Sequence, residues 1–177
     1  MWSKYEKIRN IIEYFLAFCI CGWIYESIWC EMIDANNGFV NHGFLFGPWL
    51  PIYGFGMLAI VFVLKKLKVK NGYLVFLLGT LIATIVELIG SYIIEFTTGG
   101  FLWDYSSHFL NFQGRIALQP DLMFGVLTLI GMKILLPKLD ILQNRFGKNI
   151  LHNIVFIVLF VFFLADVIAR IWLGSNI

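Results

Sequence analysis

Long runs of apolar residues, separated by short polar or glycine-rich segments, make up most of this chain. A helix needs about 20 such residues to cross a bilayer. The runs do not alternate with a period of two, which favours helices over strands. Five runs are long enough to span, over residues 8–33, 48–65, 73–96, 118–137 and 150–173. The pattern predicts an all-α, polytopic membrane helix bundle, with residues 1–177 as a single integral membrane domain.

The overall composition points to the same class of protein. The chain is 60% hydrophobic and 14% charged, whereas soluble domains are about 45–50% apolar and about 25% charged. The lipid bilayer is therefore an expected partner, in a multi-pass protein of a cell membrane. No basic patch interleaved with aromatic residues points to nucleic-acid binding. The basic N-terminal end precedes a run too long for a signal-peptide core, so we expect a retained first span.

The basic residues indicate an orientation. They gather in three regions, the first ten residues, the 65–70 segment and the 138–148 segment. Five spans would place all three regions on one side of the membrane, and basic loops favour the cytoplasmic side. We therefore predict an N-terminus inside and a C-terminus outside, with most of the acidic residues in the outer half.

Acidic side chains lie inside or at the ends of the apolar runs. A charge at the centre of a membrane helix costs about 2.5–3.5 kcal/mol on insertion scales, so each acid must be protonated, paired or exposed to a water-filled cavity. Two of them, Glu87 and Glu95, share one helix face with Ser91, because residues four apart are neighbours on a helix. The five acids are Glu26, Glu87, Glu95, Asp121 and Asp166.

Two cations are available to these acids in the outer half. Arg170 follows Asp166 by four residues, which predicts a structural ion pair within one helix. Arg115 is then the expected counter-charge of the other four acids. Four carboxylates exceed one guanidinium, so we expect an outward-facing polar pocket for a cationic or proton-coupled ligand. Its predicted residues are Glu26, Glu87, Glu95, Asp121, Arg115, Asp104, Trp49 and Tyr53.

Residues 38–56 combine glycines and prolines with aromatic residues. They are too broken for one helix and too apolar for an ordinary loop. Non-helical backbone at membrane depth is tolerated only when it is buried in protein or lines a cavity. The segment is therefore predicted to fold over the polar pocket. The alternative is an interfacial aromatic belt with turn glycines.

Four sequence motifs resemble the ABC-transporter type IV permease family, also called CmpB-like, and the resemblance covers roughly residues 10–135. They are GWIYE at 22–26, GFLFGPWLPIYGFG at 43–56, WDYS at 103–106 and NFQGRI at 111–116. The resemblance implies a permease component in a bacterial cytoplasmic membrane. The chain has no GxxxxGK[ST] phosphate-binding motif, so a separate ATPase subunit would have to supply the energy.

Catalytic signatures are missing from the sequence. There is no GxSxG nucleophile motif, and the histidines show no zinc-ligand spacing. We therefore expect no catalytic residue, no cofactor and no metal site, and a protein that is not an enzyme. Two alternatives stay open. One is a membrane-embedded enzyme acting on an outer-leaflet lipid or lipid-linked substrate, and the other is a structural or regulatory membrane subunit.

Overall fold

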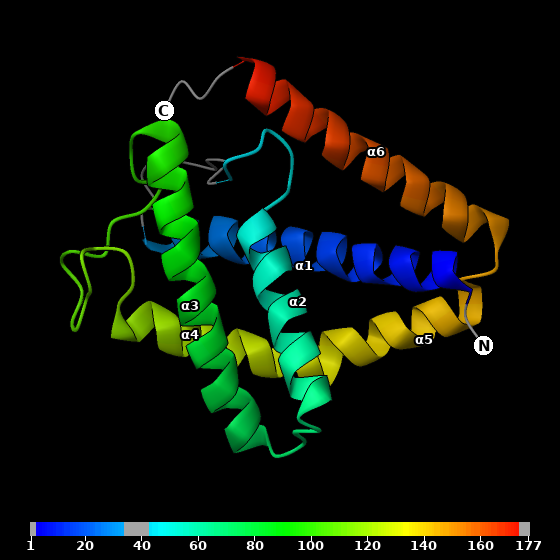
Figure 1. Ribbon diagram of the computed structural model, residues 1–177, viewed down its shortest axis with the longest axis horizontal. Helices are drawn as coiled ribbons and strands as arrows, with labels where there is room; N and C mark the ends of the chain where they lie inside the picture. The colour runs from blue at the N-terminus through cyan, green and yellow to red at the C-terminus, as the bar shows by residue number, and fades with distance from the viewer. Residues whose placement is uncertain (1–2, 34–42, 174–177) are drawn as a thin grey trace. The chain divides into compact units, whose positions relative to one another are not determined.

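The computed structural model describes residues 3–33, with the side chains only up to residue 28, and residues 43–173. These ranges contain no β-strand, only an isolated bridge between Phe112 and Ile116. The predicted all-α membrane class is thus confirmed. The helices in Figure 1 are α1 (Lys4–Ile33), α2 (Pro51–Lys66), α3 (Gly72–Thr98), α4 (Leu118–Ile130), the π-helical turn η1 (Gly131–Leu135), α5 (Leu136–Phe146) and α6 (Ile150–Leu173).

The number of spans differs from the prediction. Among the described residues, four helical segments are long and apolar enough to cross a membrane: Lys4–Ile28, Gly72–Thr98, Leu118–Phe146 and Ile150–Leu173. The second of the five predicted spans, 48–65, falls short, because α2 has 16 residues and at 1.5 Å per residue is only about 24 Å long. Pro51 is the first residue of this helix, so residues 48–50 of the predicted span are not part of it. The predicted N-in, C-out orientation rested on five crossings and stays a prediction.

The fourth predicted element also continues beyond its expected end. Instead of a span over 118–137 and a loop over 138–148, one helical segment runs from Leu118 to Phe146. Pro137 has no backbone N–H to donate within a helix. The wide turn η1 ends two residues before it, and the Leu136 N–H donates to the Gly131 carbonyl five residues back. A local π-helical turn thus accommodates the proline without ending the helix.

The chain divides into two compact units, residues 1–54 with 139–176 and residues 55–138. We call them unit 1 and unit 2 and describe each by itself. The single integral membrane domain predicted for residues 1–177 stays a prediction.

Unit 2 is built around the packing of α3 against α4, visible in Figure 1. Two glycines allow this contact. A Cβ atom on Gly79 would lie 2.4 Å from Cγ2 of Thr128, and one on Gly125 would lie 2.2 Å from Oγ1 of Thr80. Both distances are too short for any side chain, so the glycines let the backbones approach closely, as small residues do between membrane helices.

Unit 1 has its apolar core between α1, α6 and the segment 43–50. The buried residues of this core are Leu16, Cys19, Leu45, Trp49 and Phe156. The Trp49 ring meets Phe163 edge-on at 5.6 Å, and the Leu50 N–H donates to the Cys19 carbonyl over 3.1 Å. In the described part of the glycine-rich segment, Leu45, Trp49 and Leu50 are therefore buried in protein, whereas Phe46 is 54% exposed. Burial in protein is what non-helical backbone at membrane depth requires. That it covers the acidic pocket stays a prediction, and residues 38–42 lie outside the described ranges.

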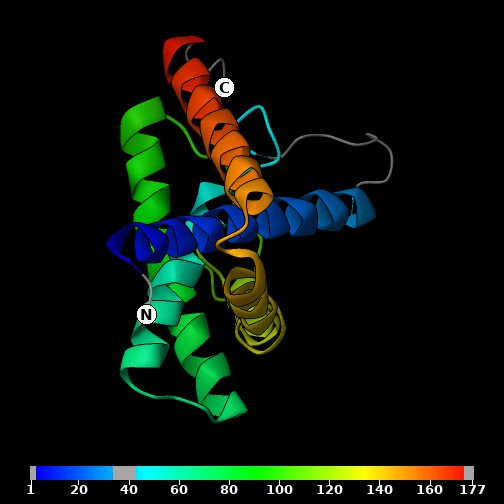
Figure 2. The same cartoon turned by 90° about the vertical axis from the view of Figure 1, so that its right-hand side faces the viewer.

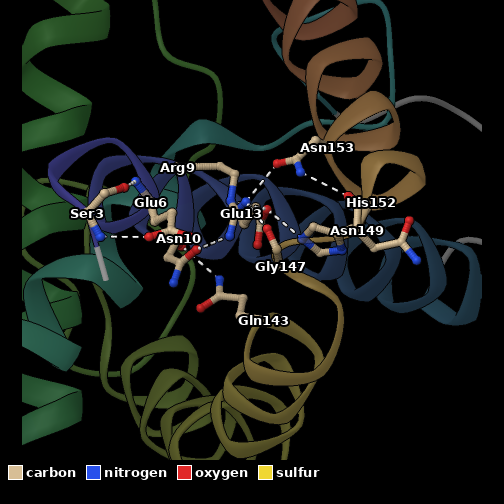
Figure 3. Close-up of polar contacts among 10 residues, drawn as sticks. All are labelled: Ser3, Glu6, Arg9, Asn10, Glu13, Gln143, Gly147, Asn149, His152 and Asn153. Atoms are coloured by element: carbon tan, nitrogen blue, oxygen red, sulfur yellow. Dashed lines mark hydrogen bonds and ion pairs between the residues drawn. The ribbon is translucent and has the colours of Figure 1, made fainter. Parts of the chain in front are cut away.

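A buried polar junction ties the N-terminal end of α1 to the α5–α6 turn, which lies beside it in Figure 2. Arg9 is only 1% exposed. Its guanidinium donates to the Gly147 carbonyl and, over 2.7 Å, to the Asn153 side chain, and pairs with Glu13 at 3.2 Å. Glu13 also contacts Nε2 of His152 at 2.9 Å. Figure 3 shows these groups converging from α1, from the turn after α5 and from α6.

Neighbouring polar contacts extend this junction along α5. The Gln143 amide donates to the Asn10 carbonyl over 3.1 Å, and Gln143 is 2% exposed. The Tyr14 hydroxyl donates to the Asp140 carboxylate. The basic 138–148 segment, predicted to be a loop, is therefore largely helical and held against α1 by polar side chains.

Candidate functional site: an acidic face of α3 under a closed loop

The acidic stripe predicted on α3 is present in unit 2. Glu87 and Ser91 are 5% and 4% exposed, respectively, and Glu95 follows one turn later. All three belong to α3 and share one face because they are four residues apart. Each has a contact to the loop 99–117, directly or through Arg115, so this loop covers the stripe.

The loop is held by its own hydrogen bonds. Gly99 ends α3 in the left-handed conformation, with φ of 76°, which favours glycine. The Asp104 carboxylate accepts the Ser106 N–H over 2.8 Å and its hydroxyl over 3.0 Å. The Trp103 indole N–H donates to the Arg115 carbonyl over 2.9 Å. Asp104, predicted to line the pocket, therefore has its carboxylate engaged in shaping the loop.

Arg115 is inserted from the loop onto the stripe and is 5% exposed. Its guanidinium pairs with the Glu95 carboxylate and donates to Oγ of Ser91 over 2.8 Å. The guanidinium carbon lies 4.0 Å from the centre of the Tyr92 ring and 4.8 Å from that of Phe101. The structure thus gives Arg115 a carboxylate partner, as expected from the charge count. Only one terminal nitrogen of Arg115 contacts the Glu95 carboxylate, because the other donates to Ser91.

A second acidic contact lies deeper along the stripe. The Tyr105 hydroxyl donates to Oε1 of Glu87 over 3.1 Å. Asp121, in the first turn of α4, has its carboxyl near the side chains of Thr84 and Glu87 and interacts with both. Two carboxyl groups from different helices therefore meet beside a phenol and a threonine.

The other predicted pocket residues belong to unit 1. The Tyr53 hydroxyl donates to the Glu26 carboxylate, and Tyr25 lies beside Tyr53 with 6.2 Å between ring centres. Trp49 is buried in the apolar core. In unit 1 the structure therefore brings Glu26 and Tyr53 together but not Trp49, and a pocket lined by all eight residues stays a prediction.

The predicted Asp166–Arg170 ion pair is wrong. Asp166 instead accepts the backbone N–H groups of Phe46, over 3.0 Å, and Gly47, over 2.7 Å. The Arg170 guanidinium lies over the Phe44 and Phe46 rings, at 5.0 and 5.1 Å. The spacing of four residues made the ion pair possible, but two otherwise unpaired backbone donors compete for the carboxylate, and such donors are costly to leave without an acceptor.

Several contacting residues were not among those predicted from the sequence. Tyr105 belongs to the WDYS motif and Thr84 lies one helical turn before Glu87. Their positions in the sequence could have indicated them, but a search for charged residues does not find them. In the described ranges, no group of three or more His, Cys, Asp and Glu side chains is arranged to hold a metal ion.

Comparison with known proteins gives one match. A family model described as "Putative ABC-transporter type IV" matches residues 13–171 of the 177 residues. No curated protein matches the chain, and no solved structure matches it.

Proposed function

This chain belongs to the ABC-transporter type IV family, and on that premise we propose that it is a permease component carrying an acidic site for a cationic or proton-coupled ligand. It is a multi-pass membrane protein, and the part of the chain that the structure describes has four helices able to span. We place it in the bacterial cytoplasmic membrane. Because its sequence contains no phosphate-binding GxxxxGK[ST] motif, a separate ATPase subunit would supply the energy.

The contact between Glu87 and Asp121 carries the ligand part of this proposal. Two carboxyl groups in contact within an apolar helix pair cannot both be ionised without a large electrostatic cost. They therefore share a proton or hold a cation between them. Glu95 does not compete for this role, because Arg115 already neutralises it. The site is thus the carboxyl pair of α3 and α4, with Tyr105 as a hydroxyl donor to it.

Dicyclohexylcarbodiimide distinguishes a protonated carboxyl from an ionised one. A protonated carboxylic acid adds across its N=C bond, and the adduct rearranges to a stable N-acylurea. In purified protein we expect labelling of Glu87 or Asp121, detected by peptide mass spectrometry, and no labelling of the ion-paired Glu95. If added Na⁺ or K⁺ prevents labelling, the ligand is a cation. If neither ion prevents labelling, the carboxyl pair holds a proton instead.

Matched variants sharpen this measurement. Whichever of Glu87→Gln and Asp121→Asn replaces the labelled residue should abolish its labelling, while Cys21, which is exposed, still reacts with a thiol reagent as in the unchanged protein. Equal labelling of Glu95, or no labelling of either member of the pair, would contradict the acidic-site proposal. The second result would favour a structural subunit.

The proposed ATPase partner has its own test. The tagged chain, isolated in a mild detergent from cells that produce it naturally, should retain a protein that hydrolyses ATP. Isolation after a high-salt wash, which weakens polar subunit contacts, is the control. An eluate that never hydrolyses ATP, together with conversion of an added lipid by the purified chain, would instead support the membrane-embedded enzyme.

A further inference from the structure

The guanidinium of Arg170 lies against two aromatic faces and has no hydrogen-bond acceptor among the described residues. Phe44 and Phe46 are 5.0 and 5.1 Å from its central carbon. Its Nε atom is buried without a partner. An arginine has five N–H donors, and leaving buried donors unsatisfied is costly. The aromatic rings hold the cation in place but accept no conventional hydrogen bond.

Asp166, the acidic residue closest to Arg170 in the sequence, already accepts hydrogen bonds from other groups. The carboxylate oxygens of Asp166 accept the Phe46 and Gly47 N–H groups, one each. The carboxylate lies close against the backbone here, because a Cβ atom on Gly47 would lie 2.9 Å from Oδ2 of Asp166. Asp166 therefore fixes the segment that carries both rings, and it leaves the Arg170 charge to another anion.

The length of α6 places Arg170 near a membrane surface. α6 begins at Ile150, and the rise to Arg170 is about 30 Å at 1.5 Å per residue, which equals the usual thickness of the hydrocarbon core. The helix ends three residues later, at Leu173. Trp172, 87% exposed, lies in the same turn, and tryptophan is enriched at the headgroup level.

We propose that Arg170, framed by Phe44 and Phe46, binds a phosphate group at the membrane surface. The planar guanidinium presents parallel N–H donors that match two phosphate oxygens. Stacking on the rings occupies only the faces of the guanidinium, so the N–H donors along its edge stay available to the phosphate. The phosphate belongs to a phospholipid headgroup or to a soluble phosphate compound. This site involves residues of unit 1 alone, uses none of the carboxyl pair, and is independent of the proposed transport function.

The test compares anion binding by the purified protein in a phosphate-free maltoside detergent. Native mass spectrometry follows the retention of phosphatidylglycerol and of phosphatidylcholine, and isothermal calorimetry follows inorganic phosphate. We expect phosphatidylglycerol to bind about tenfold more weakly to Arg170→Gln than to the unchanged chain, the size of one charge-assisted contact. Arg170→Lys should be intermediate, because lysine keeps the charge but lacks the planar fork.

The two sources of phosphate give different results. Arg170-dependent lipid binding that inorganic phosphate does not displace identifies the headgroup, whereas Arg170-dependent binding of inorganic phosphate identifies a soluble ligand. Arg145→Gln is the matched control, since Arg145 also lies over a phenylalanine ring, at 5.1 Å, but is exposed. Unchanged binding by both Arg170 variants, or an equal loss in Arg145→Gln, would overturn the proposal. Arg170→Lys, which keeps the cation, guards against a loss caused by misfolding.

Discussion

Replacing Arg9 with methionine is expected to lower the free energy of unfolding by about 3–5 kcal/mol, the cost of removing one partner from a buried ion pair. Methionine keeps an unbranched apolar side chain in place of the arginine stem but donates no hydrogen bond. The variant leaves the Glu13 side chain, 12% exposed, with only the imidazole of His152. It also removes the donor to Asn153. Thermal unfolding in detergent, followed by tryptophan fluorescence, should shift downward by roughly 6–20 °C.

Two further variants separate charge burial from a general loss of stability. Lys7→Met lies two residues away on the same helix but at an exposed position, so it should change stability by less than about 0.5 kcal/mol. Combining Arg9→Met with Glu13→Leu should recover part of the loss, because the orphaned carboxylate is then gone. Equal effects of Arg9→Met and Lys7→Met would show that the junction contributes nothing measurable.

Removing Glu95 is expected to destabilise unit 2 more than removing its partner Arg115. The Arg115 side chain is 6% exposed and that of Glu95 is 41% exposed. Glu95→Leu leaves a buried cation without its anion, which should cost about 3 kcal/mol or more. Arg115→Met leaves a carboxylate that water can reach, so the expected cost is only about 1–2 kcal/mol. The order of the two effects follows from which charge stays buried.

Hydrogen exchange of the loop 99–117 measures this order directly, because its backbone closes over the ion pair. The amide of Tyr105, which donates to the Gly114 carbonyl over 2.7 Å, should exchange faster in both variants and fastest in Glu95→Leu. Thr97→Val, at an exposed position on α3, serves as the control and should leave exchange unchanged. A larger effect in Arg115→Met would mean that stacking on Tyr92 holds the loop, and not the charge.

The helices were predictable because a helix that crosses a membrane needs a continuous run of apolar residues of matching length. The errors arose where composition and backbone chemistry disagree. Residues 48–50 are apolar enough to extend a span, yet the helix begins only at Pro51. In contrast, the polar residues after Pro137 looked like a loop, but the turn η1 lets the helix continue to Phe146. Hydropathy reports solvent preference and contains no information about such a backbone adjustment.

The candidate site was predictable along a helix and unpredictable across loops. The common face of Glu87, Ser91 and Glu95 follows from helical spacing alone. The pairing of Arg115 with Glu95 follows from the scarcity of cations, although the choice of this acid among several depends on the loop conformation. The Asp166–Arg170 prediction failed because it considered side-chain charges and omitted the backbone donors of the 43–50 segment, which bind Asp166 instead.

The hydrogen bonds from Phe46 and Gly47 to Asp166 join residues 120 and 119 positions apart, which sets an order on events during synthesis. At about 5–20 residues per second, the ribosome needs roughly 6–24 s to make the intervening chain. Throughout that interval the aromatic segment has already been synthesised, but its carboxylate acceptor does not yet exist. The segment is therefore synthesised early but can reach its final conformation only after α6, the last helix, has been made.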